Sequence, residues 1–135
     1  MIVDTGVLYA HMDVRDGDHT ASLRLLETAG VPLYVPTLVL GETAYLLEQR
    51  YGAEAEARLL AAVAAAEFIL EHPTQPDIVR TAELVLEYGD WPLGTVDASV
   101  IATAERLEVT TIATLDRRHF GAVRPRHVER FELLP

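Results

Sequence analysis

The chain has 135 residues, half of them apolar, which suits one globular domain with a substantial core. Cysteine is absent, which excludes disulfides and thiolate metal sites, and no apolar run is long enough to suggest a membrane span. Acidic residues outnumber basic ones by 21 to 11, and the net charge of −10 argues against a generic nucleic-acid coat protein, which should be basic.

Apolar periodicity and turn residues divide the chain into alternating strands and helices. In chain order, we predict a strand over residues 1–3, helices over 4–12 and 19–28, a strand over 33–35, helices over 36–52 and 53–66, a strand over 68–70, helices over 76–88 and 95–107, and strands over 110–115 and 128–133. This alternation predicts an α/β domain over residues 1–135, with a parallel sheet covered on both faces. Such sheets place their chemistry beyond the carboxyl ends of the strands.

The distribution of charge along the chain is uneven. All 11 basic residues are arginines, and five of them lie between positions 117 and 130. This pattern fits a solvated acidic surface with a basic tail as well as it fits a binding site. The first residues, MIVDTGVLYA, have neither a basic region nor a small-residue cleavage site, so we expect no signal peptide and a cytoplasmic location.

Two aspartates follow predicted strands. Asp4 comes after the apolar residues 1–3, and Asp116 comes after the β-branched stretch 110–115. If these strands are parallel, both carboxylates lie at the same end of the sheet. Either aspartate alone is more often a turn or N-cap residue, but the pair on neighbouring strands favours a functional site.

Two further acids lie on predicted helices. Glu42 stands in the segment PTLVLGETAYLL, where nearly every other residue is apolar or small, and a charge is seldom buried unless it is paired or bound to metal. The alternative is a glutamate on a thin solvent-facing stripe. Asp97 lies in the first turn of helix 95–107, which carries no other charge before Glu105. The helix dipole alone would also favour an acid there.

Converging carboxylates repel one another, so a cation must offset their charge or some must stay protonated. The chain has no lysine, and the arginines closest in sequence to these motifs are Arg117 and Arg118. Oxygen ligands of this kind suit magnesium or manganese, which keep several waters and leave room for a phosphate. The chemistry implied is phosphodiester hydrolysis, in which the metal lowers the pKa of a water and a carboxylate orients it.

Four motifs together resemble the PIN-domain family, and most of all the toxin subunits of VapBC-type toxin–antitoxin pairs. They are VDTG at 3–6, GE among leucines at 41–42, WPLGTVDASVIATAERL at 91–107 and TIATLDRRHF at 111–120. The resemblance extends to about residue 125. It implies a three-layer α/β/α sandwich around a central, mainly parallel sheet of about five strands, and a ribonuclease that depends on Mg²⁺ or Mn²⁺.

The resemblance also implies a role for each acid. By position, Asp4 and Asp97 are the main metal ligands, and Asp116 completes the metal site or supports it. Glu42 holds or activates the attacking water. All four acids are expected to be catalytic.

Four more residues have supporting roles in this interpretation: Thr5, Thr114, Arg117 and Arg118. The two hydroxyl residues match those that the family has near its first and last acids, although a threonine inside a strand is more often there for packing. The two arginines follow the last acid directly and are expected to contact RNA backbone. An exposed charged turn explains them equally well.

The resemblance implies partners as well as a substrate. Members of the family are commonly homodimers, and a cognate antitoxin wraps the toxin and blocks its site. The arginines after Asp116 could receive an acidic antitoxin segment, and the helices around 38–47 and 53–66 could form part of that surface or simply belong to the core.

Three alternatives differ from a toxin ribonuclease. A PIN-like binding module without turnover would be favoured by the loss of an acid, and none is missing. A PIN nuclease acting in RNA processing or on DNA would keep the same site. A phosphatase-like or receiver-like acidic pocket would resemble this one, but a receiver needs a lysine partner, which this chain lacks.

Overall fold

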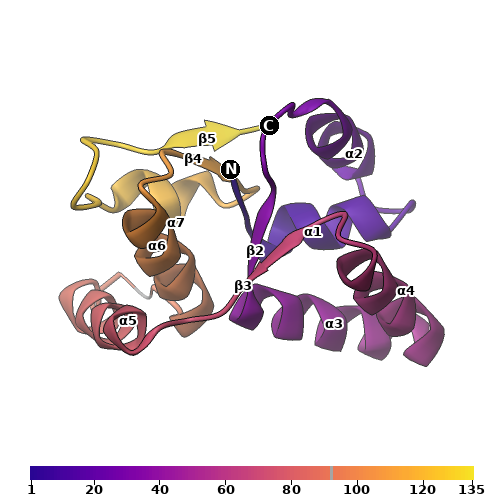
Figure 1. Cartoon of the computed structure of the whole chain (residues 1–135), viewed down its shortest axis with the longest axis horizontal. Coiled ribbons are helices and arrows are strands. Elements are labelled where there is room, and N and C mark those ends of the chain that lie inside the picture. The colour runs from indigo at the N-terminus through magenta and orange to yellow at the C-terminus, as the bar shows by residue number, and fades with distance from the viewer. Residues whose placement is uncertain (92) are drawn as a thin grey trace.

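The computed structural model describes residues 1–91 and 93–135 and contains a five-stranded, fully parallel sheet (Figure 1). Its strand order is β3-β2-β1-β4-β5. The strands are β1 (Ile2–Val3), β2 (Tyr34–Pro36), β3 (Ile69–Glu71), β4 (Thr111–Ala113) and β5 (Glu132–Leu134). The predicted parallel sheet is therefore confirmed, with strands shorter than the apolar runs of the sequence.

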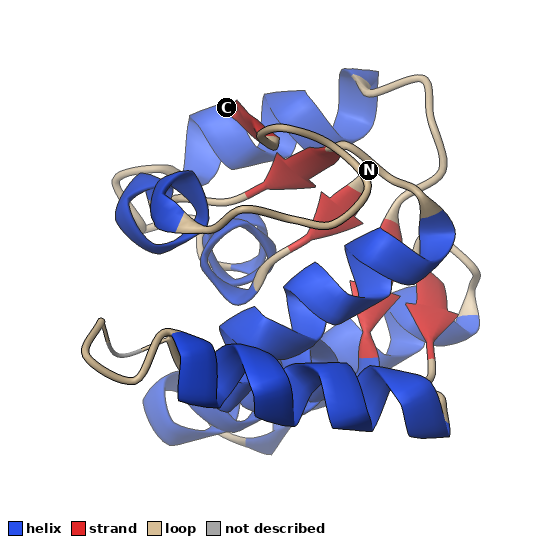
Figure 2. Ribbon diagram, turned by 90° about the vertical axis from the view of Figure 1, so that its left-hand side faces the viewer, coloured by secondary structure: helices blue, strands red, loops and turns tan. Residues whose placement is uncertain are grey.

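Helices cover both faces of this sheet, as the α/β/α prediction requires. In the described residues they are α1 (Thr5–Met12), α2 (His19–Thr28), α3 (Thr37–Tyr51), α4 (Ala53–Ala64), α5 (Gln75–Glu87), α6 (Thr95–Leu107) and α7 (Arg117–Ala122). Figure 1 shows α5 and α6 on one side of β1 and β2, and α1 and α4 on the other; Figure 2 shows the strands between helices. No helix in the described ranges is long and apolar enough to cross a membrane.

The central strands explain why the sheet holds together. Ile2, Val3, Val35, Ile112 and Ala113 are fully buried, as expected for strands that have helices on both faces. Helix α6 packs against β1 and β2, and every residue of its central segment 98–104 is buried. This confirms the prediction of a buried helix from the absence of charge after Asp97.

The pairing of β1 with β4 brings two predicted site residues to one edge. The two strands are parallel, with Ile2 opposite Ile112 and Val3 opposite Ala113. The backbone N–H of Asp4 donates to the Ala113 carbonyl over 2.9 Å, which extends the pairing one residue beyond β1. Asp4 therefore leaves the sheet at its carboxyl edge, next to the segment that leads from β4 to Asp116.

Two predictions of local structure need correction. The last strand was expected over 128–133, but only 132–134 pair with β4. The preceding residues contact helix α6 and the residues that follow it. The Arg126 N–H donates to the Glu105 carboxylate on α6 over 3.0 Å, and His127 Nε2 lies 2.9 Å from the carbonyl oxygen of Val109, two residues after the helix. Helix α7 was not predicted, because six residues are too few to show an apolar period.

Candidate active site

An open cleft of about 580 Å³ lies at the carboxyl edge of the sheet. The acids that line it come from four different places in the chain: the end of β1, helix α3, the first turn of α6 and the start of α7. The lining residues are Asp4, Thr5, Gly6, Glu42, Asp97, Leu115, Asp116, Arg117 and Arg118. The structure thus brings together all four predicted acids. Residue 92, within the motif 91–107, lies outside the described residues.

The hydroxyl of Thr114 connects the first acid with the last. Thr114 is buried at the end of β4, and its Oγ1 donates to Asp4 Oδ2 over 2.8 Å. The same oxygen accepts the backbone N–H of Asp116 over 2.9 Å. This threonine therefore fixes the side chain of one acid and the backbone of another, which is more than the strand packing that the sequence also allowed.

Thr5 makes the corresponding contact to Glu42. The Thr5 hydroxyl donates to Glu42 Oε2 over 2.6 Å, which ties the start of α1 to helix α3. Glu42 itself is exposed, and the surrounding helix is less buried than its apolar sequence predicts, with Tyr45 62% and Leu46 39% exposed. Glu42 is thus exposed to solvent, as one of the two interpretations of its sequence predicted, and its side chain also borders the cleft.

Asp116 both borders the cleft and caps a helix. Its Oδ1 accepts the backbone N–H groups of Arg118 and His119 over 3.1 and 2.9 Å, which satisfies the free donors at the start of α7. His119 Nδ1 lies 2.8 Å from Asp116 Oδ2 and 3.5 Å from Asp97 Oδ2. His119 was not predicted from the sequence. Only its spacing of three residues from Asp116 hinted at the contact, and no helix was predicted there to give that spacing meaning.

The electrostatics of the cleft disfavour a full set of negative charges. Burial raises the pKa of Asp4 to about 6, and repulsion from Asp97 and Glu42 adds to this, although the hydrogen bond from Thr114 opposes it. Burial likewise raises the pKa of Asp97, with repulsion from Asp116 and Glu42, while His119 opposes the shift. A cation in the cleft would relieve both carboxylates.

The chemistry of the donor set fits a hard divalent metal. The cleft offers carboxylate and hydroxyl oxygens, which magnesium and manganese prefer. Within the described residues, no group of three or more acid or imidazole side chains is arranged to hold an ion by itself. Magnesium does not need such a cage, because it keeps several waters and binds through one or two carboxylates.

The two arginines of the cleft have different contacts. Arg117 Nη1 donates to the Leu133 carbonyl over 3.3 Å, and Nη2 donates to the carbonyl of Pro135, so its guanidinium holds the end of β5. Arg118 instead lies over the indole of Trp91, with Cζ 4.3 Å from the ring centroid. Arg117 therefore contributes to the fold, and RNA contact by either arginine stays a prediction.

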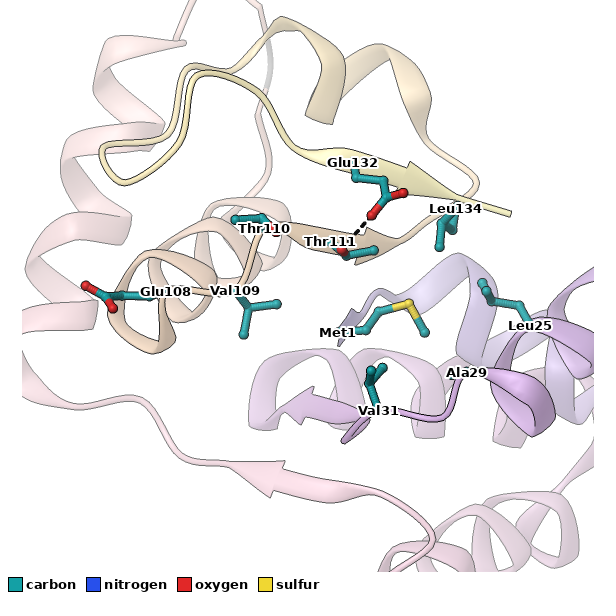
Figure 3. Close-up of a pocket in the computed structure, with 10 residues that line it drawn as sticks. All are labelled: Met1, Leu25, Ala29, Val31, Glu108, Val109, Thr110, Thr111, Glu132 and Leu134. Carbon is teal, nitrogen blue, oxygen red and sulfur yellow. Dashed lines mark hydrogen bonds between the residues drawn. The ribbon is translucent and has the colours of Figure 1, made fainter.

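A second hollow, of about 390 Å³, lies at the opposite end of the sheet (Figure 3). Its lining is mostly apolar, and its acids are Glu108 and Glu132. Glu132 accepts a hydrogen bond from Thr111 over 2.8 Å, while Figure 3 shows Glu108 directed away from the other lining residues. These two acids do not converge, so the carboxylate cleft is the better candidate for an active site.

Comparison with known proteins gives one family and several relatives. The family model described as PIN domain matches residues 1–124. Ribonuclease VapC26 of Mycobacterium tuberculosis is 36% identical over 135 residues, which cover all of both chains. Among solved structures, the sarcin–ricin loop cleaving toxin VapC20 of the same organism has a TM-score of 0.84 at 23% identity, covering 95% of this chain and 98% of its own. FitAcB of Neisseria gonorrhoeae has a TM-score of 0.68 at 15% identity, covering 99% and 96%. At these identities, the two structural matches establish the fold alone.

Proposed function

The chain belongs to the PIN-domain family, and from that premise we propose that it is a metal-dependent endoribonuclease of the VapC type, the toxin of a toxin–antitoxin pair. The observation that carries this proposal is the meeting of four acids from distant parts of the chain in one cleft. Full-length similarity to Ribonuclease VapC26 supports RNA as the substrate. The carboxylates of the cleft support hydrolysis of the phosphodiester bonds of RNA.

The four acids divide the work between metal binding and the handling of water. We infer that Asp4 and Asp97 bind the metal, that Asp116 completes or supports the site, and that Glu42 orients the attacking water. When bound, the ion lowers the pKa of a water and offsets charge on the phosphate. Thr5 holds the Glu42 carboxylate in place through its 2.6 Å hydrogen bond.

Supporting contacts keep these carboxylates in register. The Thr114 hydroxyl holds Asp4 and the backbone of Asp116 at a fixed separation. His119 Nδ1 lies near the carboxylates of Asp97 and Asp116, and a protonated imidazole there would offset part of their charge. A site built on ends of strands and helices in this way needs little rearrangement when ion and substrate bind.

The oxygen donors favour magnesium or manganese as the ion. Relatedness to VapC26 supports a cognate antitoxin that blocks the cleft, and a homodimer is the assembly expected of this family. RNA as substrate and the absence of cysteine fit a cytoplasmic protein.

Cleavage of RNA under defined metal conditions tests this function. We expect the wild-type protein to cut single-stranded RNA with Mg²⁺ or Mn²⁺, to stop in the presence of a chelator, and to resume when the ion is restored. Asp97→Asn removes the charge but keeps the shape, and we expect it to lower kcat about a hundredfold or more.

The matched control for that experiment is Asp18→Asn, an exposed aspartate before α2 whose side chain makes no capping bond. It should cleave as the wild type does. Equal cleavage by Asp97→Asn and the control would refute the metal site. A wild-type protein that binds RNA or an antitoxin without any cleavage would instead favour a binding module.

A further inference from the structure

Arg118 is a cation at the cleft whose charged end is not used by the fold. Its backbone N–H donates to Asp116 Oδ1 over 3.1 Å, which fixes where the side chain starts. In the part of the chain that the structure describes, its guanidinium makes no ion pair or hydrogen bond, and it lies over the Trp91 ring. The neighbouring Arg117 differs, because its guanidinium binds carbonyls of β5.

Trp91 and Arg118 come from segments that each carry an acid of the cleft. Trp91 precedes the first turn of α6, where Asp97 lies, and Arg118 lies in the first turn of α7 after Asp116. The Trp91 backbone N–H donates to the Tyr88 carbonyl over 2.9 Å, so this partner is also anchored. Contact between indole and guanidinium therefore joins the two segments beside the metal-binding acids.

The geometry of this contact leaves the hydrogen-bonding groups of the arginine available. An indole attracts a guanidinium through its flat face, whereas the N–H donors project from the edge. Those donors match two oxygens of one phosphate in a bidentate contact. An unsupported arginine would lose much side-chain entropy on binding, but a guanidinium already held against a ring loses less.

We propose that Trp91 is a positioning residue that holds Arg118 at the wall of the cleft, where Arg118 binds a phosphate of the substrate beside the one that is cleaved. This rests on the proposed ribonuclease function and names a determinant of substrate binding within it. A phosphate is favoured over a peptide carboxylate because Arg118 borders the same cleft as the four acids, where an RNA chain must lie to be cut.

Steady-state cleavage of single-stranded RNA at several salt concentrations tests the proposal, with saturating metal. We expect Arg118→Gln to raise KM about tenfold and Trp91→Leu about threefold to fivefold, both with little change in kcat. The double variant should match Arg118→Gln alone, since the indole acts through the guanidinium. Trp91→Phe should recover part of the loss, because a phenyl ring still supports stacking.

Salt dependence separates a phosphate contact from a structural effect. The slope of log Kd for RNA against log salt should become shallower by about one in Arg118→Gln. The control is Arg24→Gln, which removes the same charge from the exposed surface of α2 and should keep the wild-type KM and slope.

Three results would overturn the proposal: an unchanged KM in Trp91→Leu, additive effects in the double variant, or a wild-type salt slope in Arg118→Gln. Weaker binding of a poly-glutamate peptide with unchanged RNA binding would assign Arg118 to a protein partner instead. If the wild type never cleaves RNA, the ribonuclease proposal fails. The RNA affinity of the same variants, measured by fluorescence anisotropy, still decides whether Trp91 and Arg118 act together in RNA binding.

Discussion

Asp4 is the most deeply buried of the four acids, with 5% of its surface exposed. Burial is the main reason that its pKa rises from 3.8 to about 6. Between these pH values the folded protein therefore holds a proton that the unfolded chain releases, so the free energy of unfolding falls as pH rises through this window. This decrease in the free energy of unfolding is complete above pH 6 and amounts to about 3 kcal/mol.

Replacing Asp4 with asparagine should therefore stabilise the metal-free protein at high pH. Asparagine keeps the acceptor for the Thr114 hydroxyl but carries no charge. We expect Asp4→Asn to raise the free energy of unfolding by about 1–3 kcal/mol at pH 8, and this gain should disappear near pH 4. Urea unfolding at both pH values with a chelator measures it. A gain that does not change with pH, or a loss at pH 8, would contradict the assigned cause.

Asp18→Asn provides the charge-matched control for this measurement, because Asp18 is exposed and its side chain makes no capping bond. Its effect on the free energy of unfolding should be within about 0.5 kcal/mol of zero at both pH values. A large pH-dependent gain in the control would attribute the effect to net charge alone.

Helix α7 and strand β5 form one unit at the edge of the sheet. Asp116 caps the helix, Arg117 binds the carbonyls of Leu133 and Pro135, and the Thr114 N–H donates to Leu134 over 2.7 Å. The last strand of the sheet is thus held both by its pairing with β4 and by contacts with a helix of six residues. This helix also carries Arg118, so the stability of β5 and the shape of the cleft are connected.

Arg117→Gln should loosen this unit. Loss of hydrogen bonds from a charged but exposed donor should lower the free energy of unfolding by about 0.5–1 kcal/mol. Amide hydrogen exchange at Thr114 should also become faster, because its acceptor lies on β5. Arg24→Gln is the control, and equal stability and exchange in the two variants would show that Arg117 does not hold the strand.

The elements of this fold differ in how much their sequence reveals. Strands β1 and β4 and helix α6 were predictable from their apolar or β-branched residues. Such segments are typical of strands inside a covered sheet and of helices packed against it. The extent of β5 was not predictable, since it depends on contacts of Arg126 and His127 with α6 and its end. The contacts of His119 with Asp97 and of Trp91 with Arg118 also depend on distant segments meeting, for which local sequence carries no signal.

At the scale of the whole molecule, two of the five arginines of the predicted basic tail are bound to other parts of the protein. Arg126 pairs with Glu83 over 2.8 Å, and Arg117 is bound to β5. Elsewhere Arg80 pairs with Glu105 over 2.8 Å. Because the chain has a net charge of −10, we expect that a cation in the carboxylate cleft is needed for a phosphate to approach the four acids.

The positions of Asp4 and Asp116 followed from general rules, whereas the function of the four acids did not. Parallel strands β1 and β4 predicted that Asp4 and Asp116 would share an edge, and the fold confirms that edge. Oxygen donors at such an edge suggest a metal, but the choice of RNA as substrate came from family resemblance. Full-length similarity to a ribonuclease supports that choice.

The central claim, that these acids hold a divalent metal, is tested most directly by Mn²⁺ binding. Electron paramagnetic resonance measures the free ion in titrations of the wild type, Asp4→Asn, Asp97→Asn and the control Asp18→Asn. We predict that the first two substitutions each weaken Mn²⁺ binding about tenfold or more, while the control binds as the wild type does. Equal Mn²⁺ affinity in all four folded proteins would contradict the claim.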